Sequence, residues 1–176
     1  MAASVRPARS LIPPNLLQLH SEPGAVAEFQ LQNILILVWH GQPLPDVITR
    51  VELANESVRQ RAAQGMGMIH IVHAPLQLPD DSARTAMLRF TKGHNVRVVA
   101  MVVSQTGFVL SMLRSVVTGL NVLTPNRFDF RICSTFEQVA DWLPSLLADK
   151  TGVEVDPQRL LSALREADER AAGDRP

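Results

Sequence analysis

The stretch Ile34-Leu35-Ile36-Leu37-Val38-Trp39 decides how this chain is organised, because it is a continuous apolar run of strand length. Runs of this kind are typical of strands buried on both faces, as in the interior of a parallel sheet. Residues 41–45, Gly-Gln-Pro-Leu-Pro, then stop the strand. Directly before it, Glu28-Phe29-Gln30-Leu31-Gln32 alternates polar and apolar residues, which predicts a half-exposed strand, and Asn33 is expected to form the turn between the two.

Further along the chain, strand-like and helix-like patterns alternate. Apolar residues at three- and four-residue steps predict a helix over 45–64, ended by Gly65-Met66-Gly67. The patterns also predict strands at 68–73, 96–103 and 128–133, and helices that open at Asp80 or Asp81, cover 108–119, and start from a capping box at Ser134–Glu137. Pro144 is expected to end or kink the last of these helices. Strands alternating with helices predict an α/β fold with a mixed, mainly parallel sheet and helices packed against it.

The two ends of the chain differ from this middle part. Residues 1–26 contain four prolines and are expected to form a loosely ordered arm before an α/β domain at 27–148. Residues 149–176 carry an amphipathic helix from Asp156 to Ala172, with Leu160, Leu161, Leu164, Ala167 and Ala171 along one side. That apolar side either packs on its own domain or forms the contact of a homodimer.

Composition excludes several classes of protein. The chain has 176 residues, 17 basic and 17 acidic side chains, and 46% apolar residues. The apolar fraction excludes disorder for most of the chain, and no apolar run is long enough for a transmembrane helix. Charge neutrality argues against a nucleic-acid binder, which needs a basic excess or a basic patch. The bias towards arginine over lysine is common in GC-rich bacterial genomes.

No motif of nucleotide, metal or hydrolase chemistry occurs, so no cofactor and no metal site are expected. His70 and His73 lie three apart on a strand and therefore point to opposite faces, while His40 ends the preceding strand and can approach one of them. The single cysteine, Cys133, allows no internal disulfide and fits a reducing compartment such as the cytoplasm. In its apolar surroundings it is expected to be a small core residue.

Asp80-Asp81-Ser82 opens a predicted helix. Carboxylates at this position offset the helix dipole, which is the structural explanation of the motif. A functional explanation is that Ser82 is a phosphoacceptor, since added negative charge is tolerated at a helix start and can be recognised by a partner.

A polar strip on the helix predicted at 108–119 is the candidate binding site. It follows a buried strand, and ligands of open α/β sheets bind at the carboxyl ends of such strands. The alternative is an arginine whose stem packs on the helix and whose head pairs with a carboxylate such as Asp129. The candidate ligand- or partner-binding residues are Ser104, Thr106, Gly107, Phe108, Ser111, Arg114 and Ser115.

These segments resemble the STAS, or anti-sigma-factor-antagonist-like, family over about residues 28–143. Residues 28–41 are similar to the opening hairpin of that family, and Asp81-Ser82 falls where the family has its phosphorylated serine. Residues 130–143, which include Ala140-Asp141-Trp142-Leu143, resemble the closing strand and helix of the bacterial subfamily grouped with lipid-transfer-like STAS proteins. Arg84 stands where phosphorylated members have glycine.

The resemblance implies a STAS-like fold that binds other proteins or small apolar and anionic ligands, with no catalytic set. The expected function is therefore a non-enzymatic regulatory or interaction module, with residues 81–84 and the polar strip as its contact surface. The alternative is a binder of a lipid or small ligand between sheet and helices, in a pocket lined by Phe108, Met112 and Trp142. The third candidate is an enzyme that uses His40, His70 or Cys133.

Overall fold

The computed structural model describes residues 15–73, 80–93, 95–103, 115, 118–119 and 128–173. Within these ranges the chain forms an α/β fold, as predicted, built on a six-stranded mixed sheet. The strands are β1 (Leu17–Glu22), β2 (Val26–Leu31), β3 (Ile34–Trp39), β4 (Met66–Val72), β5 (Val96–Val103) and β6 (Asp129–Cys133). The helices are α1 (Pro45–Ala54), α2 (Glu56–Arg61), α3 (Asp81–Gly93), α5 (Phe136–Thr151) and α6 (Pro157–Ala172).

The strands lie in the sheet in the same order as in the chain. β1, β2 and β3 are antiparallel neighbours, and β3, β4, β5 and β6 are parallel neighbours, so the sheet is mostly parallel. The β2–β3 hairpin pairs Leu31 with Ile34, which leaves Gln32 and Asn33 as a two-residue turn. The predicted turn at Asn33 is therefore confirmed.

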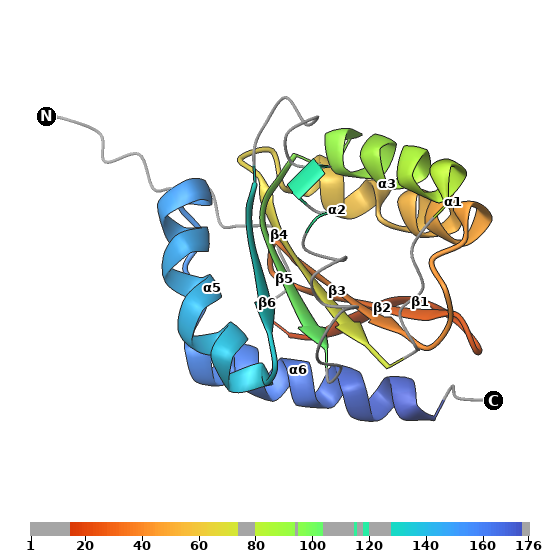
Figure 1. Ribbon diagram of the computed structural model, residues 1–176. Coiled ribbons are helices and arrows are strands. Elements are labelled where there is room, and N and C mark those ends of the chain that lie inside the picture. Colours follow the sequence, from red (N-terminus) through yellow and green to blue (C-terminus); the bar gives the residue numbers. More distant parts are fainter. Residues whose placement is uncertain are drawn as a thin grey trace, which may run out of the picture.

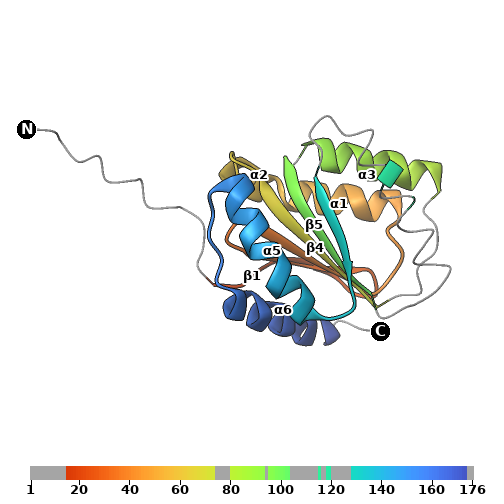
Figure 2. The same ribbon diagram turned by 60° about the vertical axis from the view of Figure 1, so that its left-hand side comes forward.

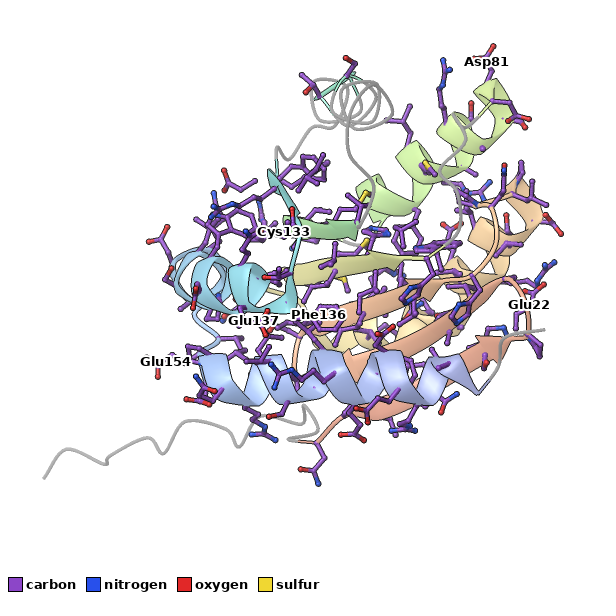
Figure 3. The ribbon with its side chains drawn as sticks, turned by 60° about the horizontal axis from the view of Figure 1, so that its bottom comes forward. Glu22, Asp81, Cys133, Phe136, Glu137 and Glu154 are labelled. Atoms are coloured by element: carbon purple, nitrogen blue, oxygen red, sulfur yellow. The ribbon has the colours of Figure 1, made fainter. Side chains whose placement is uncertain are left out.

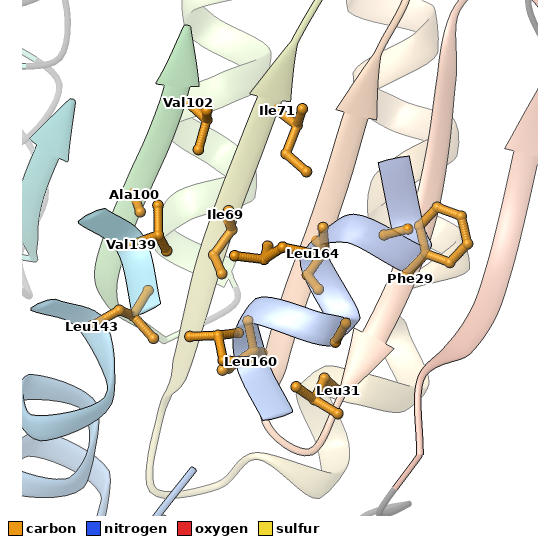
Figure 4. Close-up of a cluster of buried hydrophobic side chains, with 14 of the residues drawn as sticks. Phe29, Leu31, Ile69, Ile71, Ala100, Val102, Val139, Leu143, Leu160 and Leu164 are labelled. Atoms are coloured by element: carbon orange, nitrogen blue, oxygen red, sulfur yellow. The ribbon is translucent and has the colours of Figure 1, made fainter. Parts of the chain in front are cut away.

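Helices cover both faces of the sheet (Figures 1 and 2). α1, α2 and α3 lie on one face, and α5 and α6 lie on the other. Each face has its own buried apolar cluster, one beneath α1–α3 and one beneath α5 and α6. Figure 4 shows the second cluster, in which Leu160 and Leu164 of α6 meet strand residues such as Ile69 and Phe29. The apolar run 34–39 is buried on both faces, as its sequence predicts.

The strand before that run differs from the prediction. β2 is not half-exposed: all six of its residues are buried, including Glu28 at 0% and Gln30 at 1% exposure. Glu28 and Gln30 lie on the face beneath the α1–α2 segment together with Val26, and the other apolar residues of β2 lie beneath α5 and α6: Ala27, Phe29 and Leu31. Alternation therefore marks two differently lined buried faces here, rather than one buried face and one exposed face.

The N-terminal segment also differs. Residues 17–22 were expected within a loosely ordered arm, but they form strand β1 and pair antiparallel with β2. Pro23, Gly24 and Ala25 form the connection, with Gly24 at a φ of +73°, a conformation that favours glycine. Residues 1–14 of the predicted arm lie outside the described residues.

The helix predicted over 45–64 is divided. α1 ends at Ala54, Asn55 is not helical, and α2 then covers Glu56–Arg61. The amide of Asn55 bonds to the Val51 carbonyl at 3.1 Å, and its own carbonyl accepts from Val58 at 3.0 Å. The apolar spacing continues across the break because Val51 and Val58 are both buried on the same cluster.

Two details of α5 correct the prediction. The N-cap is Thr135, one residue later than predicted: its hydroxyl accepts from the amide of Gln138 at 3.3 Å, and the Gln138 side-chain oxygen accepts from the amide of Ser134 at 2.8 Å. Of the two effects expected of Pro144, an end or a kink, the end is wrong, because the helix runs on to Thr151. Leu143 and Leu147, on either side of the proline, are fully buried, and this packing holds the helix together across the missing amide donor.

The C-terminal helix α6 packs most of its apolar side on its own domain, which is the first of the two predicted alternatives. Asp156 caps it by accepting from the amide of Arg159 at 2.8 Å. Leu160, Leu164, Ala167 and Ala171 are each 0% exposed against the sheet and α5. The apolar face that was a candidate homodimer contact is thus covered by the chain itself.

Candidate functional site

The described elements enclose a hollow of about 280 Å³ where β4 and β5 end and α5 begins. The carboxyl ends of neighbouring parallel strands meet at this edge of the sheet, which is where open α/β folds bind ligands. The apolar part of its wall comes from Ile71, Val72, Val102 and Phe136, and the polar part from His73, Ser134, Thr135 and Glu137. Phe136 and Glu137 lie at the first turn of α5, close to Cys133 at the end of β6 (Figure 3).

His73 joins this edge to α6. Its Nε2 atom lies 2.5 Å from Oδ1 of Asp168, which is on α6. The ring also stacks on His40, with ring centroids 5.6 Å apart and planes 12° apart. The prediction that His40 approaches one of the two strand histidines is therefore confirmed, and the histidine is His73.

His70 belongs to a different environment. Its Nδ1 accepts a hydrogen bond from the Trp39 indole at 3.1 Å, and the two rings stack with centroids 6.3 Å apart. Burial lowers the pKa of His70 to about 4, so the ring is neutral at pH 7. An imidazole whose acceptor nitrogen is already occupied by an indole is poorly placed to act as a general base.

Cys133 is 1% exposed and lies in the apolar cluster beneath α5 and α6, as expected of a core residue. Burial raises the pKa of its thiol, which disfavours the thiolate that nucleophilic chemistry needs.

Glu137 is the acidic side chain of the hollow, and its charge is paired with Arg165 of α6. Hydrogen bonds from its own backbone amide and from Arg165 lower the pKa of this carboxyl, and the Arg165 bond is 2.7 Å long. The hollow therefore presents an apolar floor with an ionised carboxylate, two hydroxyls and an imidazole around it.

Most of the residues predicted as a binding strip lie outside the described residues: Ser104, Thr106, Gly107, Phe108, Ser111 and Arg114. Ser115 is described: it is helical and its side chain is exposed. Asp129, the carboxylate considered as a partner for Arg114, makes a 2.6 Å ion pair with Lys150. Of the proposed lipid-pocket residues, Phe108 and Met112 also lie outside the described ranges, and Trp142 packs at the edge of the core under the guanidinium of Arg131.

The helix start at Asp80–Arg84 forms as its sequence predicts. Asp80 is the cap: it accepts from the amide of Ala83 at 2.8 Å and from the hydroxyl of Ser82 at 2.6 Å, and these two bonds lower its pKa. Ser82 and Arg84 are exposed. The helix stripe behind them is buried, with Ala83, Ala86 and Phe90 each at 6% exposure or less.

Sequence reasoning missed the pairing of His73 with Asp168 and the hollow beside it. The two residues are 95 positions apart, and only the return of α6 beneath the sheet brings them together. The sequence does place Asp168 at the border of the apolar side of the C-terminal helix, because it follows Ala167 directly and is four residues after Leu164. A carboxylate at that border indicates a polar contact with the surface that the helix covers.

No family model, no curated protein and no solved structure matches this chain. In the part of the chain that the structure describes, no helix is long and apolar enough to span a membrane. Among the same residues, no three His, Cys, Asp or Glu side chains are grouped as metal ligands would be. The fold and the site thus define the chain as an α/β protein with a small hollow at the carboxyl edge of a mostly parallel sheet.

Proposed function

We propose that this protein is a non-enzymatic interaction module of the STAS-like kind, which binds another protein at the carboxyl edge of its parallel strands. The observation that supports the proposal is the hollow beside Phe136 and Glu137, with a volume of about 280 Å³. Small-molecule sites are usually about 300–1,000 Å³, so this hollow is at the lower end of that range and suits an inserted side chain or a small ligand better than a whole lipid.

The chemistry of the hollow indicates what that side chain would be. Its apolar floor favours an aliphatic or aromatic group, and the ionised Glu137 with the hydroxyls of Ser134 and Thr135 favours hydrogen-bond donors around it. A partner side chain that combines an apolar stem with a hydrogen-bond-donating head, such as lysine or arginine, satisfies both conditions, with its head competing with Arg165 for Glu137.

The test fills the hollow without touching the core. Ser134→Trp places a large ring at an exposed rim residue, and Ser145→Trp is its matched control, an exposed serine on α5 that does not line the hollow. A photo-crosslinking residue at Gln138 would report the bound protein in cells of the source organism. We expect one discrete cross-linked protein in the unmodified chain. Its yield should fall by at least about tenfold in the Ser134→Trp variant and be retained in the control, because blocking the central pocket of an interface removes most of the binding affinity.

The lipid- or small-ligand-binding alternative predicts a different result. Mass spectrometry under native conditions would then show a co-purified small molecule, displaced by Ser134→Trp, with no protein cross-link at position 138. That outcome would replace the interaction module by the alternative.

A further inference from the structure

A polar cluster is buried beneath the α1–α2 segment, far from the hollow in the fold. Glu28 of β2 is 0% exposed, and so is Asn55, the residue that separates α1 from α2. The Asn55 amide nitrogen donates to Oε2 of Glu28 at 2.5 Å and to the Val51 carbonyl at 2.7 Å. Asn55 thus ties the helix break to the sheet through a single side-chain contact with Glu28.

The cluster holds more hydrogen-bond acceptors than donors. In the part of the chain that the structure describes, Oε1 of Glu28, Oδ1 of Asn55 and Oε1 of Gln30 are all buried without a hydrogen-bond partner. The same holds for one imidazole nitrogen beside them, Nε2 of His20 on β1, so three acceptors stand against one potential donor. A buried acceptor without a donor costs about 1–3 kcal/mol, and a buried charge costs more. A proton on Oε1 of Glu28 removes the charge and turns one of the surplus acceptors into a donor.

Among the residues that the structure describes, no ion pair includes Glu28. Across β1 it faces His20, which stands directly opposite, and Glu22, whose negative charge opposes ionisation of Glu28. Across β3 it faces Leu37, and one strand further His70 continues the same row of the sheet. The described ion pairs of the helices above are those of Arg50 with Asp46 and with Glu22 of β1, of Glu52 with Arg89 of α3, and of Glu56 with Arg59.

We propose that Glu28 carries a proton in the native fold, and that loss of this proton to solvent base releases Asn55 and opens the α1–α2 segment. The carboxyl O–H bond breaks and its electron pair stays on the carboxylate. The charged group must then be hydrated, and water reaches it only if the helix break moves away from the sheet. The α1–α2 segment is thus a pH-sensitive element that is closed in neutral solution and loosens as pH rises.

The pKa of Glu28 agrees with this geometry. Burial raises it from 4.5 to about 8, partly offset by the Asn55 bond and reinforced by Glu22. Because the folded pKa is above that of the open state, the contribution of this group to closure is complete below pH 4.5 and is lost as pH rises through about 8. Within that window the opening equilibrium constant increases about tenfold per pH unit.

Hydrogen exchange tests the proposal on the intact protein. Amides of residues 55–62 should show an opening constant that rises about tenfold per pH unit between pH 6 and 8, beyond the base catalysis of exchange itself. Glu28→Gln, which has the same shape and cannot ionise, should abolish that excess. Glu166→Gln is the matched control, since it makes the same change at an exposed carboxylate on α6.

Infrared spectroscopy supplies a test that needs no folded variant. The unmodified protein should show the C=O stretch of an undissociated carboxyl group at pH 6, and this band should disappear as pH is raised above 8. Absence of the band at pH 6, or an exchange profile for residues 55–62 that is the same in wild type and Glu28→Gln, would overturn the proposal.

Discussion

His70 illustrates how burial alone sets the charge of one side chain. The ring lies on the same face of the sheet as Glu28, and burial lowers its pKa to about 4 because the charged form would lose part of its hydration. Its Nδ1 is the acceptor for the Trp39 indole, so protonation there would also break a hydrogen bond. Acid should therefore destabilise the fold through this residue.

The sign of that effect can be stated. The folded pKa of His70 lies below the ordinary value of 6.5, so its contribution to stability is complete above pH 6.5 and is lost as pH falls towards 4. His70→Gln keeps an acceptor for Trp39 and cannot be protonated. In wild type, the contribution of His70 should raise the equilibrium constant of unfolding about tenfold for each pH unit between pH 6.5 and 4.5 as the solution becomes more acidic. In His70→Gln this contribution should be absent, which denaturant unfolding at a series of pH values would show.

An imidazole titration followed by NMR provides the direct check on the wild type. The His70 ring signals should stay those of the neutral form down to about pH 5. A ring that titrates near its ordinary value would contradict the assigned environment.

At the scale of elements, Asn33 connects three parts of the fold. It is 1% exposed in the β2–β3 turn, and its side-chain nitrogen donates to the Gly65 carbonyl at 3.1 Å and to the Thr151 hydroxyl at 3.2 Å. Gly65 precedes β4, and Thr151 ends α5. One amide thus fixes the hairpin, the start of a parallel strand and the end of a helix relative to one another.

Asn33→Ala should therefore cost more than a turn substitution usually does. We expect a loss of about 1–3 kcal/mol in the free energy of unfolding, because the Gly65 carbonyl would be left buried without a donor. Asn15→Ala, the same change at an exposed residue, should stay within about 0.5 kcal/mol of wild type. Equal stabilities of the two variants in urea unfolding would contradict the structural role of Asn33.

Hydrophobic periodicity was sufficient to predict the existence and type of most elements. The bounds of the strand predicted at 96–103 are confirmed. A valine-rich run of this length, with glycine and polar residues before and after it, is typical of a strand and not of a helix. The break at Asn55 could not be predicted, since the apolar spacing continues through it and the reason for the break is a contact with Glu28, which is 27 residues away.

Strand β1 shows a second limit. Leu17-Gln18-Leu19-His20 alternates in the way a strand does, and Pro23-Gly24 is a turn signal, but the prolines before it favoured a loose arm. Whether such a segment forms a strand depends on a free sheet edge to pair with. That edge belongs to β2, and its availability follows from the topology rather than from the local sequence.

At the scale of the whole molecule, α6 completes the fold. It covers the antiparallel side of the sheet, next to α5, and without it Phe29 and Leu31 would lose their cover (Figure 4). The candidate site depends on the same helix, because Asp168 holds His73. The sequence predicted the helix and its apolar side, but the surface that it covers emerges only from the assembled sheet.

Leu164→Ala tests this role. The side chain is 0% exposed, so we expect a loss of about 2–5 kcal/mol in unfolding free energy, against at most about 0.5 kcal/mol for Leu53→Ala, a leucine that is 73% exposed on α1. Because α6 covers its own domain, the unfolding midpoint should not change over about a tenfold range of protein concentration. A midpoint that moves with concentration would show that a second chain contributes to the cover of this helix.

Glu28 and His70, which lie in one row across β2, β3 and β4, should both affect the calorimetric enthalpy of unfolding. The two groups exchange protons in opposite directions when the chain unfolds: Glu28 releases a proton between pH 4.5 and about 8, and His70 takes one up between about pH 4 and 6.5. Near pH 5.5 the two exchanges cancel, so the calorimetric enthalpy of unfolding should be the same in buffers with different heats of ionisation. Near pH 7.3 only the release remains, and the enthalpy should differ between those buffers by about the heat of transferring one proton.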